Sequence, residues 1–215
     1  MALVVAGLLL CGAVRANGPM VAEPDIAAAA PEPAARQELR RLYEAQARLP
    51  LWTDAGGRPN RNARAALALL ADAATDGLDP AAYRAAELAA SVVALQAAAS
   101  SGADVGAFDA AMSAAVLRYL RHLHAGRVDA RAVGFRVPAR GREPDYGALL
   151  RDALAGERLA ATASELMPTL PQYRRLRALL VPYRLLAAAP AEPLPAWTRP
   201  VKPGAPCAGL PALQR

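Results

Sequence analysis

The sequence predicts an all-α fold built from several helices. A chain of 215 residues, of which 54% are hydrophobic, is long enough for one globular core and hardly for two. Aromatic residues make up only 5% of the chain, whereas barrels and sandwiches are rich in aromatic and β-branched residues. Apolar residues also recur every three or four positions along most of the chain, which is the spacing of one helix face.

The first segment, residues 1–16, is typical of a signal peptide. Ala2–Val14 is an unbroken run of small and aliphatic residues, and Val14-Arg15-Ala16 suits cleavage after Ala16. A lipoprotein signal at Cys11 fits less well, because Leu10 stands where a small residue should precede the lipidated cysteine. We therefore expect an exported chain. No other apolar run is long enough to cross a membrane.

Residues 17–33 are rich in alanine and proline, and this composition predicts a flexible lead. The first helix is expected to start near Ala34 and to end before Pro50. Trp52 follows at once, so its large side chain should pack against that helix. Asn62 is the expected N-cap of a second, amphipathic helix.

A sharp corner between two helices is predicted near Gly77. This glycine suits the left-handed residue that closes one helix, Asp79 suits the N-cap of the next, and Pro80 suits its first position. The helix that follows should run to about Ala99.

The strongest helical pattern in the chain covers Val105–Ala125 and predicts the central helix. Its inward-facing residues recur at helical spacing: Phe108, Met112, Val116, Tyr119, Leu120 and Leu123. Asp109, Arg118 and Arg121 are expected to face away from the core, and Gly126 should end the helix.

Three further helices are expected: Tyr146–Ala155, Arg158–Leu166 and a last one that includes Tyr173 and Tyr183. Pro182 lies inside the last helix, and an interior proline costs about 3 kcal/mol, so a kink or a break is predicted there. The helical domain should therefore span residues 34–189. The proline-rich composition of residues 190–215 predicts a linker.

Charge and side-chain chemistry point to no site. The formal net charge is +6, or +5 after the predicted cleavage removes Arg15. The arginines are scattered over separate predicted helices and interrupted by acids, which argues against nucleic-acid binding. Weak attraction to an anionic envelope polymer fits this charge better.

Potential ligands and nucleophiles are few. His122 and His124 stand two positions apart on a predicted helix, so they point away from each other and cannot chelate one metal. His122 is expected to be solvated beside Arg118 and Arg121. Cys207 has no neighbouring base that would activate a thiolate. We therefore assign no catalytic, cofactor-binding or metal-binding residue, and we expect no cofactor.

Four segments in order carry a family resemblance. They are Leu49-Pro50-Leu51-Trp52, the corner at residues 73–83, the central stretch at residues 108–129, and Pro168–Tyr183. Together they resemble the N-terminal scaffold region of the large periplasmic L,D-transpeptidases, which cross-link peptidoglycan, over roughly residues 36–189. Residues 197–214 are similar to the linker and opening helix of the peptidoglycan-binding module that follows in those enzymes.

The resemblance implies a periplasmic protein of the Gram-negative envelope whose partners are peptidoglycan or the family's other domains. In the family, a cysteine thiolate in a Ser/Thr-His-Gly-Cys motif attacks the peptide stem, and Gly-Cys does not occur in this sequence. We therefore expect a scaffold part, truncated before the peptidoglycan-binding and catalytic domains and not catalytic alone. The alternative is a free-standing envelope interaction module that binds the cell wall or a separate transpeptidase.

Overall fold

A computed structural model describes residues 19–97, 101–129, 131–136 and 143–189, together with residues 200, 202, 204 and 206. The predicted signal segment, Cys11 and Cys207 lie outside these residues. The chain divides into two compact units, Met1–Thr169 and Leu170–Arg215. Within the described residues, all regular structure is helical apart from one isolated bridge between Thr53 and Pro59. The all-α prediction is therefore confirmed.

The described helices of the first unit follow the chain in a simple order. They are α1 (Glu23–Ala29), α2 (Pro33–Glu44), α3 (Arg61–Ala71), the short 3-10 helices η1 (Asp72–Asp76) and η2 (Pro80–Tyr83), α4 (Ala85–Ala97), α5 (Gly102–Ala125), α6 (Tyr146–Ala155) and α7 (Leu159–Leu166). The second unit contains α8 (Pro171–Ala188). No helix among the described residues is both long and apolar enough to cross a bilayer.

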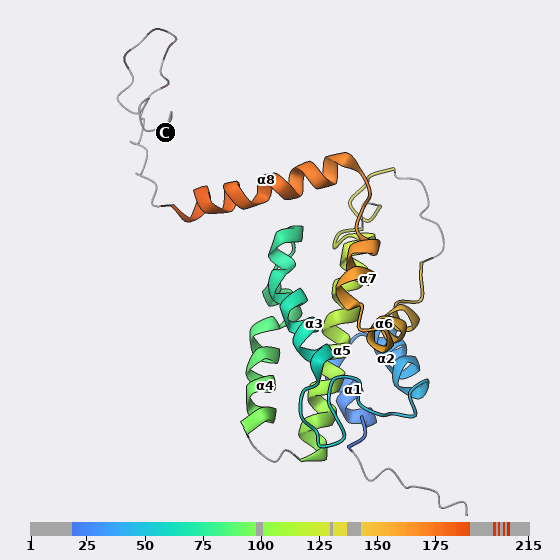
Figure 1. The fold of residues 1–215 in the computed structure, drawn as a ribbon. Coiled ribbons are helices and arrows are strands. Elements are labelled where there is room, and N and C mark those ends of the chain that lie inside the picture. The colour runs from blue at the N-terminus through green and yellow to red at the C-terminus, as the bar shows by residue number, and fades with distance from the viewer. Residues whose placement is uncertain are drawn as a thin grey trace, which may run out of the picture. The chain divides into compact units, whose positions relative to one another are not determined.

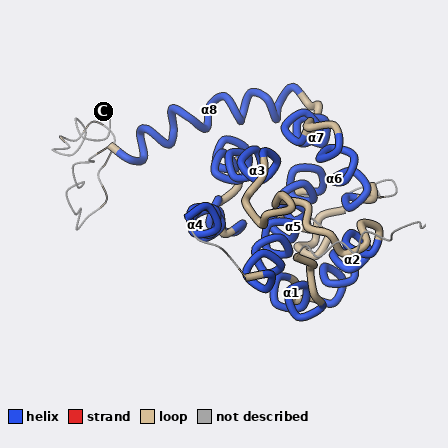
Figure 2. The backbone as a smooth tube through the Cα atoms, turned by 60° about the horizontal axis from the view of Figure 1, so that its bottom comes forward, coloured by secondary structure: helices blue, strands red, loops and turns tan. Residues whose placement is uncertain are grey.

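Helix α5 is the central element of the first unit, with the other helices of this unit arranged around it (Figures 1 and 2). The side chain of Ser101 accepts a hydrogen bond from the amide of Asp104, and the Asp104 carboxylate accepts one from the amide of Ser101. This capping box starts the helix three residues before the predicted Val105. Gly126 follows its last residue, as predicted.

The core surrounds α5 and contains residues from every α-helix of the first unit. Its largest fully buried side chains include Tyr43, Trp52, Tyr83, Tyr119, Tyr146, Met112 and Leu120. Burial of such side chains away from water is the main favourable contribution to the stability of a small domain. Trp52, which was predicted to pack against the helix before it, is fully buried in the same core cluster as Leu39, Leu42 and Tyr43 of α2.

Helix α1 lies in the stretch for which the composition predicted a flexible lead. Val21, Ile26 and Ala30 are buried in the core, and the amide of Val21 donates to the carbonyl of Arg48. The prediction missed α1 because alanine and proline spacing shows no amphipathic period. Three scattered apolar side chains nevertheless suffice to attach this seven-residue helix to α5.

The corner has the predicted chemistry but a different helix type. Gly77 has a φ of 76°, the side chain of Asp79 accepts from the amide of Ala81, and Pro80 occupies the start of the next element. That element is the short 3-10 helix η2, and Arg84 in a left-handed conformation separates it from α4. The predicted continuous helix to Ala99 is therefore wrong at its beginning.

Two other local predictions are wrong. Asn60, not Asn62, caps α3 by accepting from the amide of Ala63, while the side-chain amide of Asn62 donates to the carbonyl of Leu154. A kink or a break was predicted at Pro182, and the break does not occur, because α8 continues through this residue as one element.

Candidate functional site

A buried polar cluster connects α2, the segment after it and α5. It consists of Tyr43, Trp52, Asp109 and Ser113, whose side chains are all fully buried. Asp109 Oδ1 accepts hydrogen bonds from the hydroxyl of Tyr43 and the amide of Leu51, at 2.7 and 2.9 Å. Asp109 Oδ2 accepts from the amide of Trp52 at 2.7 Å. The Asp109 carboxylate thus binds the main-chain amides of two consecutive residues, Leu51 and Trp52, in the segment that follows α2.

Ser113 completes the cluster one helical turn further along α5. Its Oγ accepts from Trp52 Nε1 at 2.7 Å and lies 2.7 Å from the hydroxyl oxygen of Tyr43. Because the Tyr43 proton is directed at Asp109, the Ser113 hydroxyl donates to Tyr43. Every polar side-chain atom of the cluster therefore has a partner, as buried polar groups require.

Burial changes the titration of this cluster. Loss of solvation raises the pKa of Asp109 from 3.8 to about 6, against the opposing effect of its three hydrogen-bond donors. Burial and the neighbouring Asp109 charge raise the pKa of Tyr43 well above its usual range. The prediction that Asp109 faces solvent is wrong. The Asp109 side chain points into the core because it accepts hydrogen bonds from the amides of Leu51 and Trp52, which are far away in the sequence.

A second polar group connects the corner to the other end of α5. The hydroxyl of Tyr119 donates to Asp76 Oδ2 at 3.0 Å, and the hydroxyl of Tyr83 lies 2.8 Å from His122 Nδ1. The rings of Tyr83 and Tyr119 meet edge to face with centroids 5.4 Å apart. His122 is therefore half-buried, which corrects the prediction of a solvated residue.

The environment of the second group favours the neutral imidazole. Burial and then the charge of Arg118 lower the pKa of His122. Burial raises the pKa of Tyr83 to about 12. His124 contacts a different tyrosine, with its Nδ1 2.8 Å from the hydroxyl of Tyr146, so the two histidines have separate partners. Within the described residues, no group of three His, Cys, Asp or Glu side chains could hold a metal ion.

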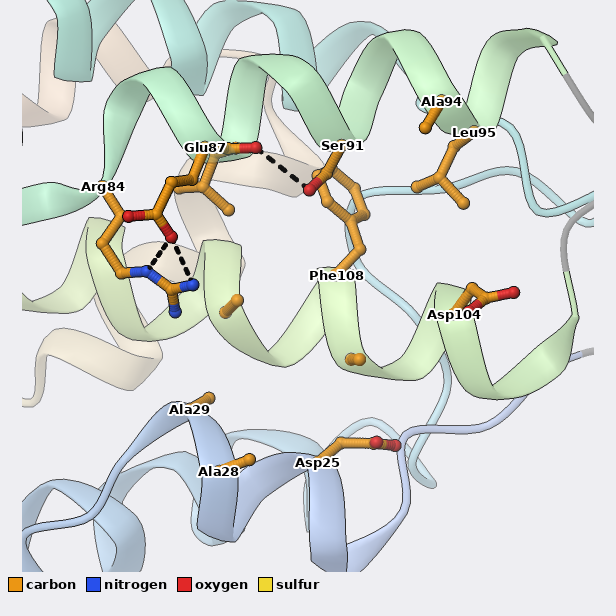
Figure 3. Close-up of a pocket in the computed structure, with 13 residues that line it drawn as sticks. Asp25, Ala28, Ala29, Arg84, Glu87, Ser91, Ala94, Leu95, Asp104 and Phe108 are labelled. Atoms are coloured by element: carbon orange, nitrogen blue, oxygen red, sulfur yellow. Dashed lines mark hydrogen bonds and ion pairs between the residues drawn. The ribbon is translucent and has the colours of Figure 1, made fainter.

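A groove with a volume of about 540 Å³ lies on the surface of the first unit. Helices α1 and α4 form its walls and α5 forms its floor, and we call it the α1–α4 groove (Figure 3). The floor consists of Ala107, Phe108 and Ala111. The charged lining residues are Asp25, Arg84, Glu87 and Asp104. Sequence reasoning missed this site because the groove depends on the separation of helices, which local patterns do not encode.

The protein is helical and organised around one central helix, α5. Residues from the segments that carry the family resemblance, such as Trp52 and Asp109, lie in its core. A family model described as Scaffold domain matches residues 37–180, about two thirds of the chain. The chain belongs to the Scaffold domain family. The comparison with curated proteins found no match, and the comparison with solved structures found none either.

Proposed function

We propose that this chain is the scaffold part of a peptidoglycan L,D-transpeptidase and acts in cell-wall cross-linking by holding other parts of that enzyme. The observation that carries the proposal is the buried polar cluster. Leu51 and Trp52 belong to the first resembling segment, and Asp109 and Ser113 belong to the third, and these residues bond to each other in the core. The matched family span also contains both segments.

The other motif residues support the same proposal. Gly77 and Asp79 of the second segment form the corner, and Asp76 and Tyr83 bond to α5 residues of the third segment. The residues that carry the resemblance are thus the ones that determine how α5 packs. This is the pattern expected where the residues of a motif have an architectural role.

The proposal assigns no catalytic step to the described helices. Acyl transfer through a cysteine requires a base that activates the thiolate and donors that stabilise the oxyanion. Asp109 and Tyr43 titrate in an unusual range, but both are fully buried and bonded to one another. They therefore stabilise the fold and cannot reach a substrate.

Carbapenem labelling of the purified full chain tests this proposal, because carbapenems acylate the active cysteine of these enzymes. We expect the intact mass to remain unchanged. Iodoacetamide, which alkylates any accessible thiol, serves as the control that Cys207 can react at all, and Cys207→Ser serves as the blank. A carbapenem adduct at Cys207 in the wild-type chain would show a catalytic role and contradict the proposal.

Binding to a separately produced catalytic domain of an L,D-transpeptidase from the same organism provides the positive test. We expect a complex by size-exclusion chromatography, and we expect the chain alone to stay in the supernatant after sedimentation with purified sacculi. Sedimentation of the chain alone, without complex formation, would favour the free-standing envelope module instead.

We also propose that the chain acts in the periplasm after export by residues 1–16. N-terminal sequencing of the mature protein from a periplasmic fraction should begin at Asn17. Recovery of the unprocessed chain in the cytoplasmic fraction would contradict this part of the proposal.

A further inference from the structure

The α1–α4 groove has an apolar interior made mainly of small side chains. Ala28 and Ala29 of α1 line one wall near the Arg84–Glu87 end, and Ala94 and Leu95 of α4 line the other wall toward the opposite end (Figure 3). Small side chains leave room for another backbone to approach the helices closely. The volume of about 540 Å³ lies within the range of about 300–1,000 Å³ that is typical of ligand sites.

The charges at the two ends of the groove differ. At one end, Arg84 forms an ion pair with Glu87 at 2.5 Å, so these two charges balance. Asp25 and Asp104 lie toward the other end (Figure 3). Among the ion pairs of the residues that the structure describes, none includes Asp25 or Asp104. This end of the groove therefore carries uncompensated negative charge.

Both aspartates are held in place by local hydrogen bonds. Asp25 Oδ2 accepts from the amide of Ala22 at 3.0 Å, and Asp104 Oδ2 accepts from the hydroxyl of Ser101 at 2.6 Å. The bond from Ser101 also lowers the pKa of Asp104, which keeps that carboxyl ionised. A Cβ at Gly106 would lie 2.5 Å from Asp25 Oδ2, so the glycine leaves the space that this carboxylate uses.

We propose that the α1–α4 groove binds a short amphipathic helix of a partner protein, with small or aliphatic residues against the floor and an Arg or Lys at the Asp25–Asp104 end. A helix that lies in an apolar groove buries its apolar face there, which is a common mode of peptide recognition. The uncompensated carboxylates select a basic segment over an acidic one. The inference is independent of the transpeptidase assignment, because it rests on the groove alone.

Fluorescence anisotropy with the full chain and two labelled peptides tests the proposal. The first probe is a short helical peptide of alanine and leucine with a pair of arginines at one end, and the second carries glutamates in place of those arginines. We expect saturable binding of the arginine peptide and no binding of the glutamate peptide. Equal binding of the two peptides, or no binding of either, would overturn the proposal.

Matched tryptophan substitutions on α4 locate the binding site. Ala94 lines the groove, whereas Ala89 is exposed on the opposite side of the same helix. Ala94→Trp should fill the groove and weaken binding of the arginine peptide by at least about tenfold, while Ala89→Trp should leave it unchanged. Equal effects of the two variants would place the peptide elsewhere and overturn the proposal.

The double variant Asp25→Asn, Asp104→Asn tests the charge without changing the shape. Asparagine keeps a side-chain oxygen that can accept the capping hydrogen bonds. The variant should bind the arginine peptide roughly threefold to tenfold more weakly, with circular dichroism confirming an intact fold. Unchanged affinity in a folded variant would show that these carboxylates do not recognise the basic residue.

Discussion

Asp109 experiences two opposing effects in the core. Removal from water favours the neutral acid, whereas hydrogen bonds from Tyr43, Leu51 and Trp52 favour the carboxylate. Burial is the larger effect, so the folded-state pKa of about 6 is higher than the ordinary value of 3.8. The folded protein therefore holds this proton over a pH range in which the unfolded chain has released it.

The sign of the resulting pH dependence follows from linkage. As pH rises from about 3 to about 7, through both pKa values, the contribution of Asp109 to the free energy of unfolding should fall by about 3 kcal/mol. Asp109→Asn cannot titrate, so the stability of the wild type relative to this variant should decrease over the same pH window. Urea unfolding at several pH values measures both free energies.

The comparison with Asp109→Asn cancels the titration of other groups, provided that the variant folds. A relative stability that increases with pH would contradict the prediction, because it would show that the three hydrogen bonds outweigh burial. Where Asp109→Asn does not fold, direct titration of the wild-type carboxyl by NMR gives the same information. A pKa below 3.8 would then contradict the prediction.

Ser113 offers a second test of the buried polar cluster. Ser113→Ala leaves the indole N–H of Trp52 without its acceptor in a site closed to water. The free energy of unfolding should fall by about 1–3 kcal/mol, as measured by urea denaturation. Ser164→Ala, which removes an exposed hydroxyl on α7, should change it by less than about 0.5 kcal/mol. Similar losses in both variants would indicate that the cluster has no special role.

At this scale, sequence reasoning identified Trp52 as a core residue but not its polar partners. Apolar residues reveal their burial through periodicity, whereas an aspartate in a helical pattern is assigned to solvent by default. Asp109 is buried because it bonds to the amides of Leu51 and Trp52, nearly sixty positions earlier. The sequence of α5 itself therefore does not indicate that the amides of Leu51 and Trp52 will be the donors.

The corner between η1 and η2 shows how turn chemistry sets the direction of the chain. Gly77 adopts a left-handed conformation, and its amide donates to the carbonyl of Ala74. The side chain of Asp79 then caps the following turn. Because Asp76 immediately precedes this glycine and bonds to Tyr119, the corner also holds η1 against α5.

Substitution of Gly77 tests this element. Gly77→Ala places a Cβ at a φ of 76° and should lower the free energy of unfolding by roughly 1–2 kcal/mol. Gly77→Asn should cost less, because asparagine tolerates left-handed backbone better than alanine. Thermal or urea unfolding distinguishes them, and equal costs would indicate that the conformation of this residue is not what limits substitution.

Elements were predictable to different extents. Helix α6 has the predicted limits, Tyr146–Ala155, because an Asp cap and a clear apolar period agree there. Helix α1 was missed because it depends on contacts with distant segments. The cap of α3 was assigned to Asn62, although the cap bond is local and Asn60 forms it with the amide of Ala63. In α8 the predicted break at Pro182 is absent, so the cost of the proline does not end the helix.

Across the first unit, α5 joins the two polar groups. The buried polar cluster involves Asp109 and Ser113, and the second group involves Tyr119 and His122. The core is continuous around all of them. A local change at either end of α5 should therefore affect the packing of the whole unit.

This continuity predicts one cooperative unfolding transition for the first unit. In a Trp197→Phe background, Trp52 fluorescence reports on one end of α5, while near-UV circular dichroism reports on the tyrosines packed along the helix. The two signals should give the same urea midpoint. Separate midpoints would show that the ends of α5 unfold independently.

At the scale of the whole molecule, composition and periodicity were enough to predict the all-α class. The division before α8 and the α1–α4 groove were not predictable from the chain alone. Both depend on the distances between packed helices. Those distances follow from side-chain volumes at contacts that no local pattern identifies.

Gly106 has a consequence for how this fold can vary among related chains. A side chain at this position would meet both the Asp25 carboxylate and the main-chain carbonyl of Met20. A larger residue at 106 therefore requires both that the residue at 25 withdraws or is shorter and that the main chain at Met20 shifts slightly outward. Chains that keep glycine at 106 and aspartate at 25 should share one groove width, whereas chains that change either residue should change the other with it.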